Sequence, residues 1–182
     1  PLPVLSQYHY NQFFKDKQKP INIPETIKII DKYTFQHRGK NIHLVYIPYS
    51  VNTIGIGAFF DCKSLEKVKF DLECSIKELS QGLFDNCSKL KKIILPNSVE
   101  TIGQFAFNNC ISLKTIILPD TIKYLLPNCF SNTGLKSIKI PRKVQYINMS
   151  FYNCRSLKNI EFINKFSSIL EQLEKLERSE LV

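Results

Sequence analysis

The chain has 182 residues, of which 43% are hydrophobic, enough to bury a continuous core, and 23% are charged, as in ordinary folded domains. Its 25 basic and 16 acidic residues give a formal net charge of +9, but the lysines are scattered along the chain instead of forming a run. This scatter argues against a nucleic-acid-binding protein, and no apolar stretch reaches the roughly 18 residues that a membrane-spanning helix needs.

Residues 1–20 combine aromatic and basic side chains and precede the repetitive part of the chain. The residues concerned are Tyr8, Tyr10, Phe13, Phe14, Lys15, Lys17 and Lys19. Proteins that stack on nucleic-acid bases also use such a mixture. Because the first unit of a repeat stack must be covered, we expect an N-terminal cap or a partial repeat over residues 1–20.

Residues 21–163 repeat one phrase about six times, with a period of 22–25 residues. Phenylalanine marks the period at Phe35, Phe59, Phe84, Phe107, Phe130 and Phe151. Cysteine follows three residues later in four copies, at Cys62, Cys87, Cys110 and Cys154. Leucine follows three residues later again, at Leu65, Leu90, Leu113 and Leu157. Self-similarity at one short period predicts a solenoid, in which each repeat is buried only against its neighbours.

The copy from Leu113 to Phe130 shows what one repeat builds. The alternation around Ile116 and Leu118 predicts a strand, which Pro119 ends because proline lacks the donor that a strand ladder needs. A second short strand is expected within residues 121–125, followed by a tight turn, helical at most for one turn, that places Phe130 in the core.

The cysteines raise the question of zinc or disulfides. No two of them have a CxxC spacing, and the three histidines lie far from them in sequence, so no metal site and no cofactor are expected. Thiols that point the same way from parallel strands are poorly aimed at one another. We therefore expect free, buried cysteines, which favours a reducing compartment, while a disulfide between stacked cysteines stays open as the alternative.

Residues 90–113 carry the pattern Leu-Lys-x-Ile-x-Leu-Pro-x-Ser-Val-x-x-Ile-Gly-x-x-Ala-Phe-x-x-Cys-x-Ser-Leu. This pattern resembles the leucine-rich repeat of the BspA-like (Treponema-type) class, and the resemblance extends over residues 21–163. The first copy, residues 21–48, departs from it by lacking the cysteine, and the fifth has Thr133 at that position and is one residue short. The resemblance implies a non-enzymatic binding scaffold. Members of the class occur as bacterial surface adhesins and as surface-associated or intracellular protist proteins.

The expected fold is thus a leucine-rich repeat solenoid, a curved right-handed stack of about six repeats with a parallel sheet on its concave face. Residues 164–182 are expected to cover its last repeat. Apolar residues recur there at helical spacing, which predicts one amphipathic helix over residues 166–180. Ser168 and Glu171 have the spacing of a capping box. The alternative is a helix that binds a partner or makes a dimer.

No catalytic motif is present, so we expect function to lie in the exposed strand positions of the concave face. The residues concerned are Tyr46, Lys67, Lys69, Lys92, Ile94, Thr115, Ile117, Lys139, Asn159 and Glu161. Lysines beside isoleucines suit an acidic protein partner with an apolar anchor. The predicted function is therefore a protein-interaction scaffold, intracellular or peripheral to a membrane. A secreted or cell-surface adhesin that binds host proteins or glycans is the alternative, and the sequence does not indicate the oligomeric state.

Overall fold

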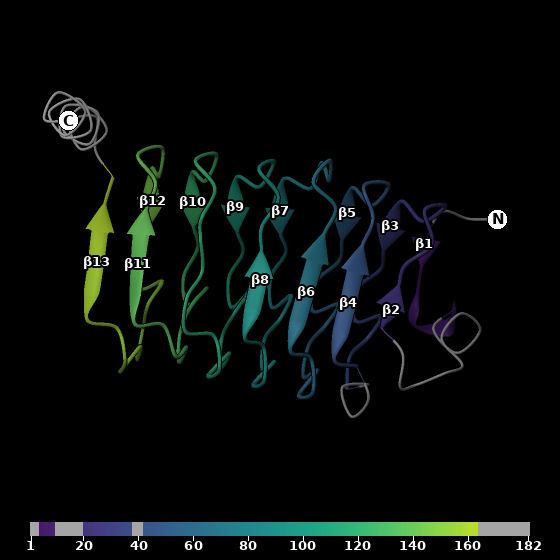
Figure 1. Ribbon diagram of the computed structural model, residues 1–182, viewed down its shortest axis with the longest axis horizontal. Coiled ribbons are helices and arrows are strands. Elements are labelled where there is room, and N and C mark those ends of the chain that lie inside the picture. The colour runs from purple at the N-terminus through teal and green to yellow at the C-terminus, as the bar shows by residue number, and fades with distance from the viewer. Residues whose placement is uncertain (1–3, 10–19, 38–41, 164–182) are drawn as a thin grey trace, which may run out of the picture.

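The computed structural model describes residues 4–9, 20–37 and 42–163, and shows a stack of parallel coils (Figure 1). Along the chain, short strands alternate between the front of Figure 1 and the rear, except that residues 115–118 form no front strand. The front strands are β2 (Ile21–Asn22), β4 (Leu44–Ile47), β6 (Lys67–Phe70), β8 (Lys92–Ile94), β11 (Ser137–Ile140) and β13 (Asn159–Phe162). The rear strands are β1 (Val4–Leu5), β3 (Ile29–Ile30), β5 (Thr53–Ile54), β7 (Glu78–Leu79), β9 (Thr101–Ile102), β10 (Tyr124–Leu125) and β12 (Tyr146–Ile147). The predicted solenoid is therefore confirmed.

All strand pairs are parallel and in register from coil to coil. The front strands form the sheets β2-β4-β6-β8 and β11-β13, and the rear strands form β1-β3-β5 and β7-β9-β10-β12. In the front sheet, Val45 pairs with Val68 and Val68 with Ile93, so equivalent buried residues lie next to one another. This register follows from the sequence period, because a slip by one residue would turn every buried side chain outward.

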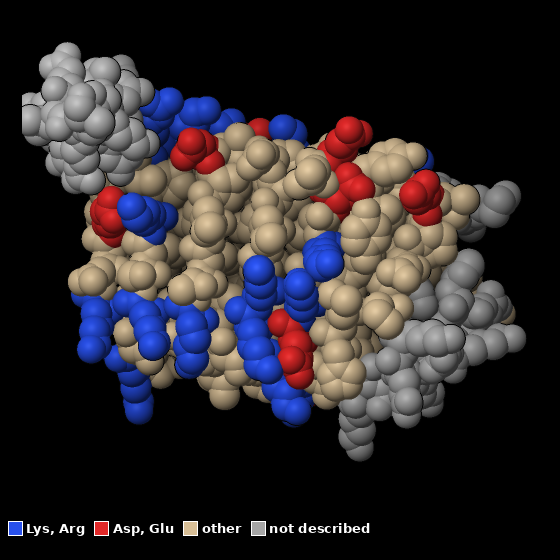
Figure 2. All heavy atoms as spheres, in the orientation of Figure 1, with Lys and Arg blue, Asp and Glu red and all other residues tan. Residues whose placement is uncertain are grey.

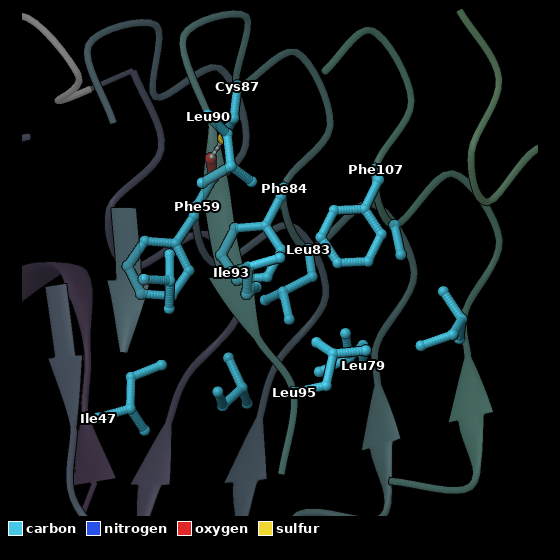
Figure 3. Packing of buried hydrophobic residues seen from close by; sticks show 14 of the residues in the cluster. Ile47, Phe59, Leu79, Leu83, Phe84, Cys87, Leu90, Ile93, Leu95 and Phe107 are labelled. Atoms are coloured by element: carbon cyan, nitrogen blue, oxygen red, sulfur yellow. Dashed lines mark hydrogen bonds between the residues drawn. The ribbon is translucent and has the colours of Figure 1, made fainter. Parts of the chain in front are cut away.

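The phenylalanines form a single column through the core, as their spacing predicts. Their rings stack at centroid distances of 4.7, 5.4, 5.5, 5.3 and 5.5 Å from Phe35 to Phe151. Figure 3 shows the rings of Phe59, Phe84 and Phe107 side by side. The coils are numbered 1 to 6 below by these phenylalanines: Phe35, Phe59, Phe84, Phe107, Phe130 and Phe151.

The cysteines are free, and all but the half-buried Cys154 are buried. Each thiol of the repeated position donates a hydrogen bond to the phenylalanine carbonyl of the coil before it. The donors are Cys62, Cys87, Cys110 and Cys154, at 3.2, 3.2, 3.2 and 2.9 Å. Thr133, which replaces cysteine in coil 5, instead donates to the carbonyl of Phe130 in its own coil at 2.9 Å. The expected free, buried thiols are therefore confirmed, and they also link successive coils.

Two backbone positions in every coil adopt a left-handed conformation. The residue two before the column phenylalanine has a positive φ in Tyr33, Gly57, Gly82, Phe105, Asn128 and Met149. The residue two after it does so in His37, Asp61, Asn86, Asn109, Asn132 and Asn153. Asparagine, aspartate and glycine tolerate this conformation, whereas tyrosine, phenylalanine and methionine are strained in it.

Replacing Met149 by glycine is therefore expected to stabilise the fold. Met149 has a φ of 49° and an exposed side chain, so the change relieves the strained backbone and removes little packing. We expect a gain of about 0.5–1 kcal/mol in the free energy of unfolding, measured by urea denaturation. Gly82→Ala is the matched opposite change, because a Cβ there would meet no atom closer than 3.9 Å while its φ is 61°. A loss of stability in Met149→Gly, or no loss in Gly82→Ala, would contradict this account of the turn.

The strand predicted around Ile116 is not formed, and it is the one part of the predicted repeat that is wrong. Ile116 and Leu118 are buried and Thr115 and Ile117 are exposed, so the alternation of side chains is as predicted. The backbone of residues 115–118, however, makes no strand pairing and no backbone hydrogen bond to the described residues. This segment and β8 border a hollow of about 380 Å³. The rest of the coil agrees with the sequence: β10 is the second short strand, and residues 127–132 form turns, with no helix.

Coil 6 leaves apolar side chains exposed at its end of the stack. Ile160 and Phe162 on β13 are 45% and 60% exposed, whereas Ile138 and Ile140 at the equivalent positions of β11 are buried. A cover for this end was expected from the helix over residues 166–180, which lies outside the described residues. At the other end, β1 pairs with β3 and extends the rear sheet by one strand.

Candidate interaction surface

The first-strand face is defined here as the outward side of β4, β6, β8, residues 115–118, β11 and β13. Strand register brings the predicted binding residues together on it. Tyr46, Lys69 and Ile94 occupy equivalent positions on three adjacent strands, and Lys67 lies next to Lys92. The sequence therefore placed these residues correctly beside one another on one sheet.

Lys67, Lys69 and Lys92 form a positively charged field without a counter-charge. None of these three lysines makes an ion pair with any residue that the structure describes, and Lys69 and Lys92 are exposed. Like charges directly opposite each other on paired strands reduce the stability of a sheet. Figure 2 shows basic side chains over β6 and β8 near the centre of the face, with acidic side chains next to them and uncharged surface above. The field is thus electrostatically unsatisfied within the described part of the chain.

Tyr46 borders this field and is held in place by Asp71. Its hydroxyl donates a hydrogen bond of 2.6 Å to the Oδ2 atom of Asp71. The hydrogen bond to the Asp71 carboxylate, with a smaller contribution from burial, raises the pKa of Tyr46 to about 12. The same bond lowers the pKa of Asp71. Asp71 replaces the proline of the other copies, so the carboxylate that fixes Tyr46 is specific to this coil.

Two isoleucines provide apolar surface next to the lysines. Ile94 is 61% exposed and Ile117 is 85% exposed, although both belong to segments whose other apolar residues are buried. The hollow of about 380 Å³ described above lies between β8 and residues 115–118, and both isoleucines line it together with Thr115. An apolar side chain of a partner has room to enter here, which a closed sheet would not allow.

The remaining predicted residues form a separate block on β11 and β13. Lys139 lies beside Glu161 and makes an ion pair of 3.2 Å with it, while Asn159 lies beside Ser137. This block therefore neutralises its own charge. The ten predicted residues share one face, but the unpaired segment 115–118 divides them into a basic block and a neutral block.

A row of lysines along one edge of the face was missed in the sequence analysis. It consists of the residue that follows the repeat leucine in four successive coils: Lys91, Lys114, Lys136 and Lys158. All four are exposed, and Figure 2 shows basic side chains gathered along the lower edge beneath β8, β11 and β13. Lys91 pairs with Glu66 at 2.9 Å, and Lys114 donates to the carbonyl of Ile111. The recurring Leu-Lys dipeptide was the available signal.

The described residues offer little support for catalysis or metal binding. No group of three or more metal-ligating side chains occurs within them, and none of their helices has the length and hydropathy to cross a membrane. Cys62, the cysteine nearest in sequence to the first-coil histidines, donates to the carbonyl of Phe35, and burial raises its pKa to about 12. His37 instead contacts the Asp61 carboxylate at 2.9 Å. Neither arrangement activates a thiolate nucleophile.

Comparison with known proteins gives a family and several similar structures. The BspA type leucine rich repeat region, in 6 copies, matches residues 6–125 and 77–173. A comparison with curated proteins gives no match. Proteins built on this kind of repeat are typically interaction or surface proteins and are generally not enzymes.

A leucine rich repeat protein of T. pallidum is 26% identical, with a TM-score of 0.73 over 80% of this chain and 70% of that one. A leucine-rich repeat protein of Bacteroides ovatus is 30% identical, with a TM-score of 0.59 over 79% of this chain and 45% of that one. A leucine rich cell surface protein of Faecalibacterium prausnitzii is 25% identical, with a TM-score of 0.61 over 80% of this chain and 48% of that one. The chain thus spans about half the length of the latter two proteins. From its matched repeats and its stacked coils, the chain belongs to the BspA-type leucine-rich repeat proteins.

Proposed function

We propose that this chain is a non-enzymatic interaction module that binds an acidic protein segment through its first-strand face. The observation that supports the proposal most directly is the field of Lys67, Lys69 and Lys92, which no acid neutralises within the described residues. Carboxylates of a partner would supply the missing charge and also steer its approach.

The neighbouring hollow favours a partner that also carries an apolar anchor. Interfaces take most of their binding free energy from a few buried apolar or aromatic side chains surrounded by polar contacts. Ile94 and Ile117 are exposed on either side of the hollow, and the lysine field lies next to them. The preferred ligand is therefore an extended segment with one large apolar residue among acidic ones.

A cell-surface adhesin is the second candidate. The similar protein of F. prausnitzii is described as a cell surface protein, and the same face would serve for recognition outside the cell. The two candidates differ in where the partner resides, and the mode of binding proposed for the face is the same in both.

We expect a random peptide library displayed on phage to yield ligands rich in aspartate and glutamate around a large apolar residue. Synthetic copies of these peptides should bind the native chain with an affinity that falls as salt rises, because exposed charges are screened. Changing Lys67, Lys69 and Lys92 to glutamate should weaken binding at least about tenfold, measured by fluorescence anisotropy.

The matched control changes the same number of charges elsewhere. Lys28, Lys32 and Lys143 are exposed, lie outside the first-strand face and make no ion pair within the described residues. Their replacement by glutamate should leave peptide affinity within about twofold of native. Selected peptides without acidic residues, or equal losses in the two triple variants, would reject the proposed face.

A further inference from the structure

A second hollow lies in the turns beyond the rear strands, away from the first-strand face. It has a volume of about 390 Å³ and spans coils 1 to 4. The hollow is lined by the residues that occupy one equivalent position in successive coils, namely the residue with a positive φ two before the column phenylalanine. That position holds Tyr33 in coil 1, Gly57 in coil 2, Gly82 in coil 3 and Phe105 in coil 4. Two aromatic residues thus flank two glycines.

The glycines open the space and the aromatic rings border it. A Cβ on Gly57 would lie 2.5 Å from the Cε1 atom of Tyr33, so the tyrosine ring lies directly over this glycine. A Cβ on Gly82 would meet nothing closer than the Cβ atom of Asp85 at 3.9 Å, so the space above Gly82 is open. A larger residue at Gly82 would enter the hollow, and one at Gly57 would collide with the Tyr33 ring.

Polar and aromatic side chains complete the lining from the neighbouring turn position. These residues are Gln36, Phe60 and Asp85, each three after the left-handed residue of its coil. Backbone hydrogen bonds of 3.1, 2.9 and 3.1 Å tie each of them back to that residue. Phe60 packs edge-on against the His37 ring at 5.6 Å, and Asp85 accepts a 3.0 Å hydrogen bond from Asn108. The lining is therefore held in place before any ligand binds.

Tyr33 and Phe105 hold unfavourable backbone conformations, with φ values of 55° and 58°. Glycine or asparagine would adopt them with less strain, as other coils show at the same position. Strained residues that persist in a structure are found preferentially where a ligand is bound. The positive φ is shared by this turn position in every coil, Met149 included, so the feature specific to coils 1 and 4 is the aromatic side chain that each places beside the hollow.

We infer that this hollow binds one neutral pyranose ring of a glycan. Aromatic rings pack against the apolar C–H face of a sugar, while the carboxamides of Gln36 and Gln81 donate to and accept from hydroxyls, and the Asp85 carboxylate accepts. No lysine or arginine lines the hollow, which disfavours an anionic ligand. The volume suits a ring-sized ligand and is too small for a helix of a protein partner.

The test uses methyl α-mannopyranoside, methyl β-glucopyranoside and methyl β-galactopyranoside as probes. We expect at least one to give saturation-transfer signals in NMR and a measurable affinity by calorimetric titration. Tyr33→Gly and Phe105→Gly should each weaken that affinity at least about tenfold. Because glycine accepts the positive φ, neither variant should lose much thermal stability, which separates loss of the site from loss of the fold.

Met149→Gly is the matched control, because it relieves the same backbone strain at the same repeat position but lies outside the hollow. It should leave sugar affinity unchanged. Choline is titrated in parallel, as aromatic rings with a carboxylate also bind organic cations. No signal from the three glycosides, unchanged affinity in both aromatic variants, or binding of choline alone would overturn the inference. These outcomes are independent of the first-strand face, because the hollow shares no residue with it.

Discussion

Replacing Phe84 by alanine is expected to lower the free energy of unfolding by about 3–5 kcal/mol, the largest effect of any single change considered for this chain. Phe84 is fully buried and its ring stacks on Phe59 at 5.4 Å and on Phe107 at 5.5 Å. Because each coil is stabilised only by its neighbours, the cavity weakens two coil-to-coil interfaces at once. Urea denaturation followed by circular dichroism measures the change.

Phe151→Ala provides the comparison at the end of the column. Its ring stacks on Phe130 at 5.5 Å but is only half-buried, so less apolar surface is lost. We expect a cost well below that of Phe84→Ala, about 1–2 kcal/mol. Equal losses of unfolding free energy in the two variants would contradict the conclusion that stacking within the phenylalanine column stabilises the coils.

Alkaline solution is expected to unfold the protein through its buried thiols. Burial raises the pKa of Cys62 and Cys129 to about 12, and raises those of Cys87 and Cys110 well above the ordinary value of 9.0. Above pH 9 the unfolded chain releases these protons while the folded chain retains them, so the free energy of unfolding falls as pH rises. This stabilising contribution is fully present below pH 9. Between pH 8 and pH 10 each thiol removes about 1.4 kcal/mol of stability in total, or about 5.5 kcal/mol for the four thiols.

Cys110→Ser isolates the thiol contribution from that of other titrating groups. Serine keeps a donor for the carbonyl of Phe84, and its hydroxyl does not ionise in this range. Urea denaturation at pH 8, 9 and 10 in the presence of a phosphine reductant should show a loss of stability between pH 8 and pH 10 that is smaller by about 1.4 kcal/mol than in the native chain. Identical slopes would mean that the Cys110 thiol titrates alike in the folded and unfolded states.

The architecture could be predicted because burial repeats at fixed positions. The spacing of the column phenylalanines was sufficient to predict that their rings would stack, and the cysteine spacing predicted buried thiols. Alternation around Ile116 also predicted which side chains are buried. It did not predict the missing strand pairing of residues 115–118, because hydrogen bonding depends on the distance to the neighbouring coils and not on the segment's own residues.

The candidate sites were predicted in part. Lys67, Lys69, Lys92 and Ile94 were found because exposed strand positions can be aligned from one copy to the next. The thiol donors were not foreseen, because their acceptors are backbone carbonyls of another coil. The turn hollow depends on Gly82, which leaves a space by having no side chain, and on Gly57, which makes room for the Tyr33 ring. A search for chemically active residue types does not detect a missing side chain. Aligning the position two before the column phenylalanine across the copies would have shown the two glycines between two aromatic residues.

Each thiol of the repeated cysteine position donates a hydrogen bond to a carbonyl of the preceding coil, and this affects the cellular compartments in which the protein can stay folded. A sulfur that is enclosed, protonated and directed at an oxygen is shielded from oxidants and from exchange with other thiols. Cysteine content therefore ceases to indicate a cellular compartment for this protein, contrary to the usual association of unpaired cysteines with the cytosol. The same repeat is compatible with export and with retention, and Cys154, the least enclosed of the six cysteines, is the thiol that would be oxidised first.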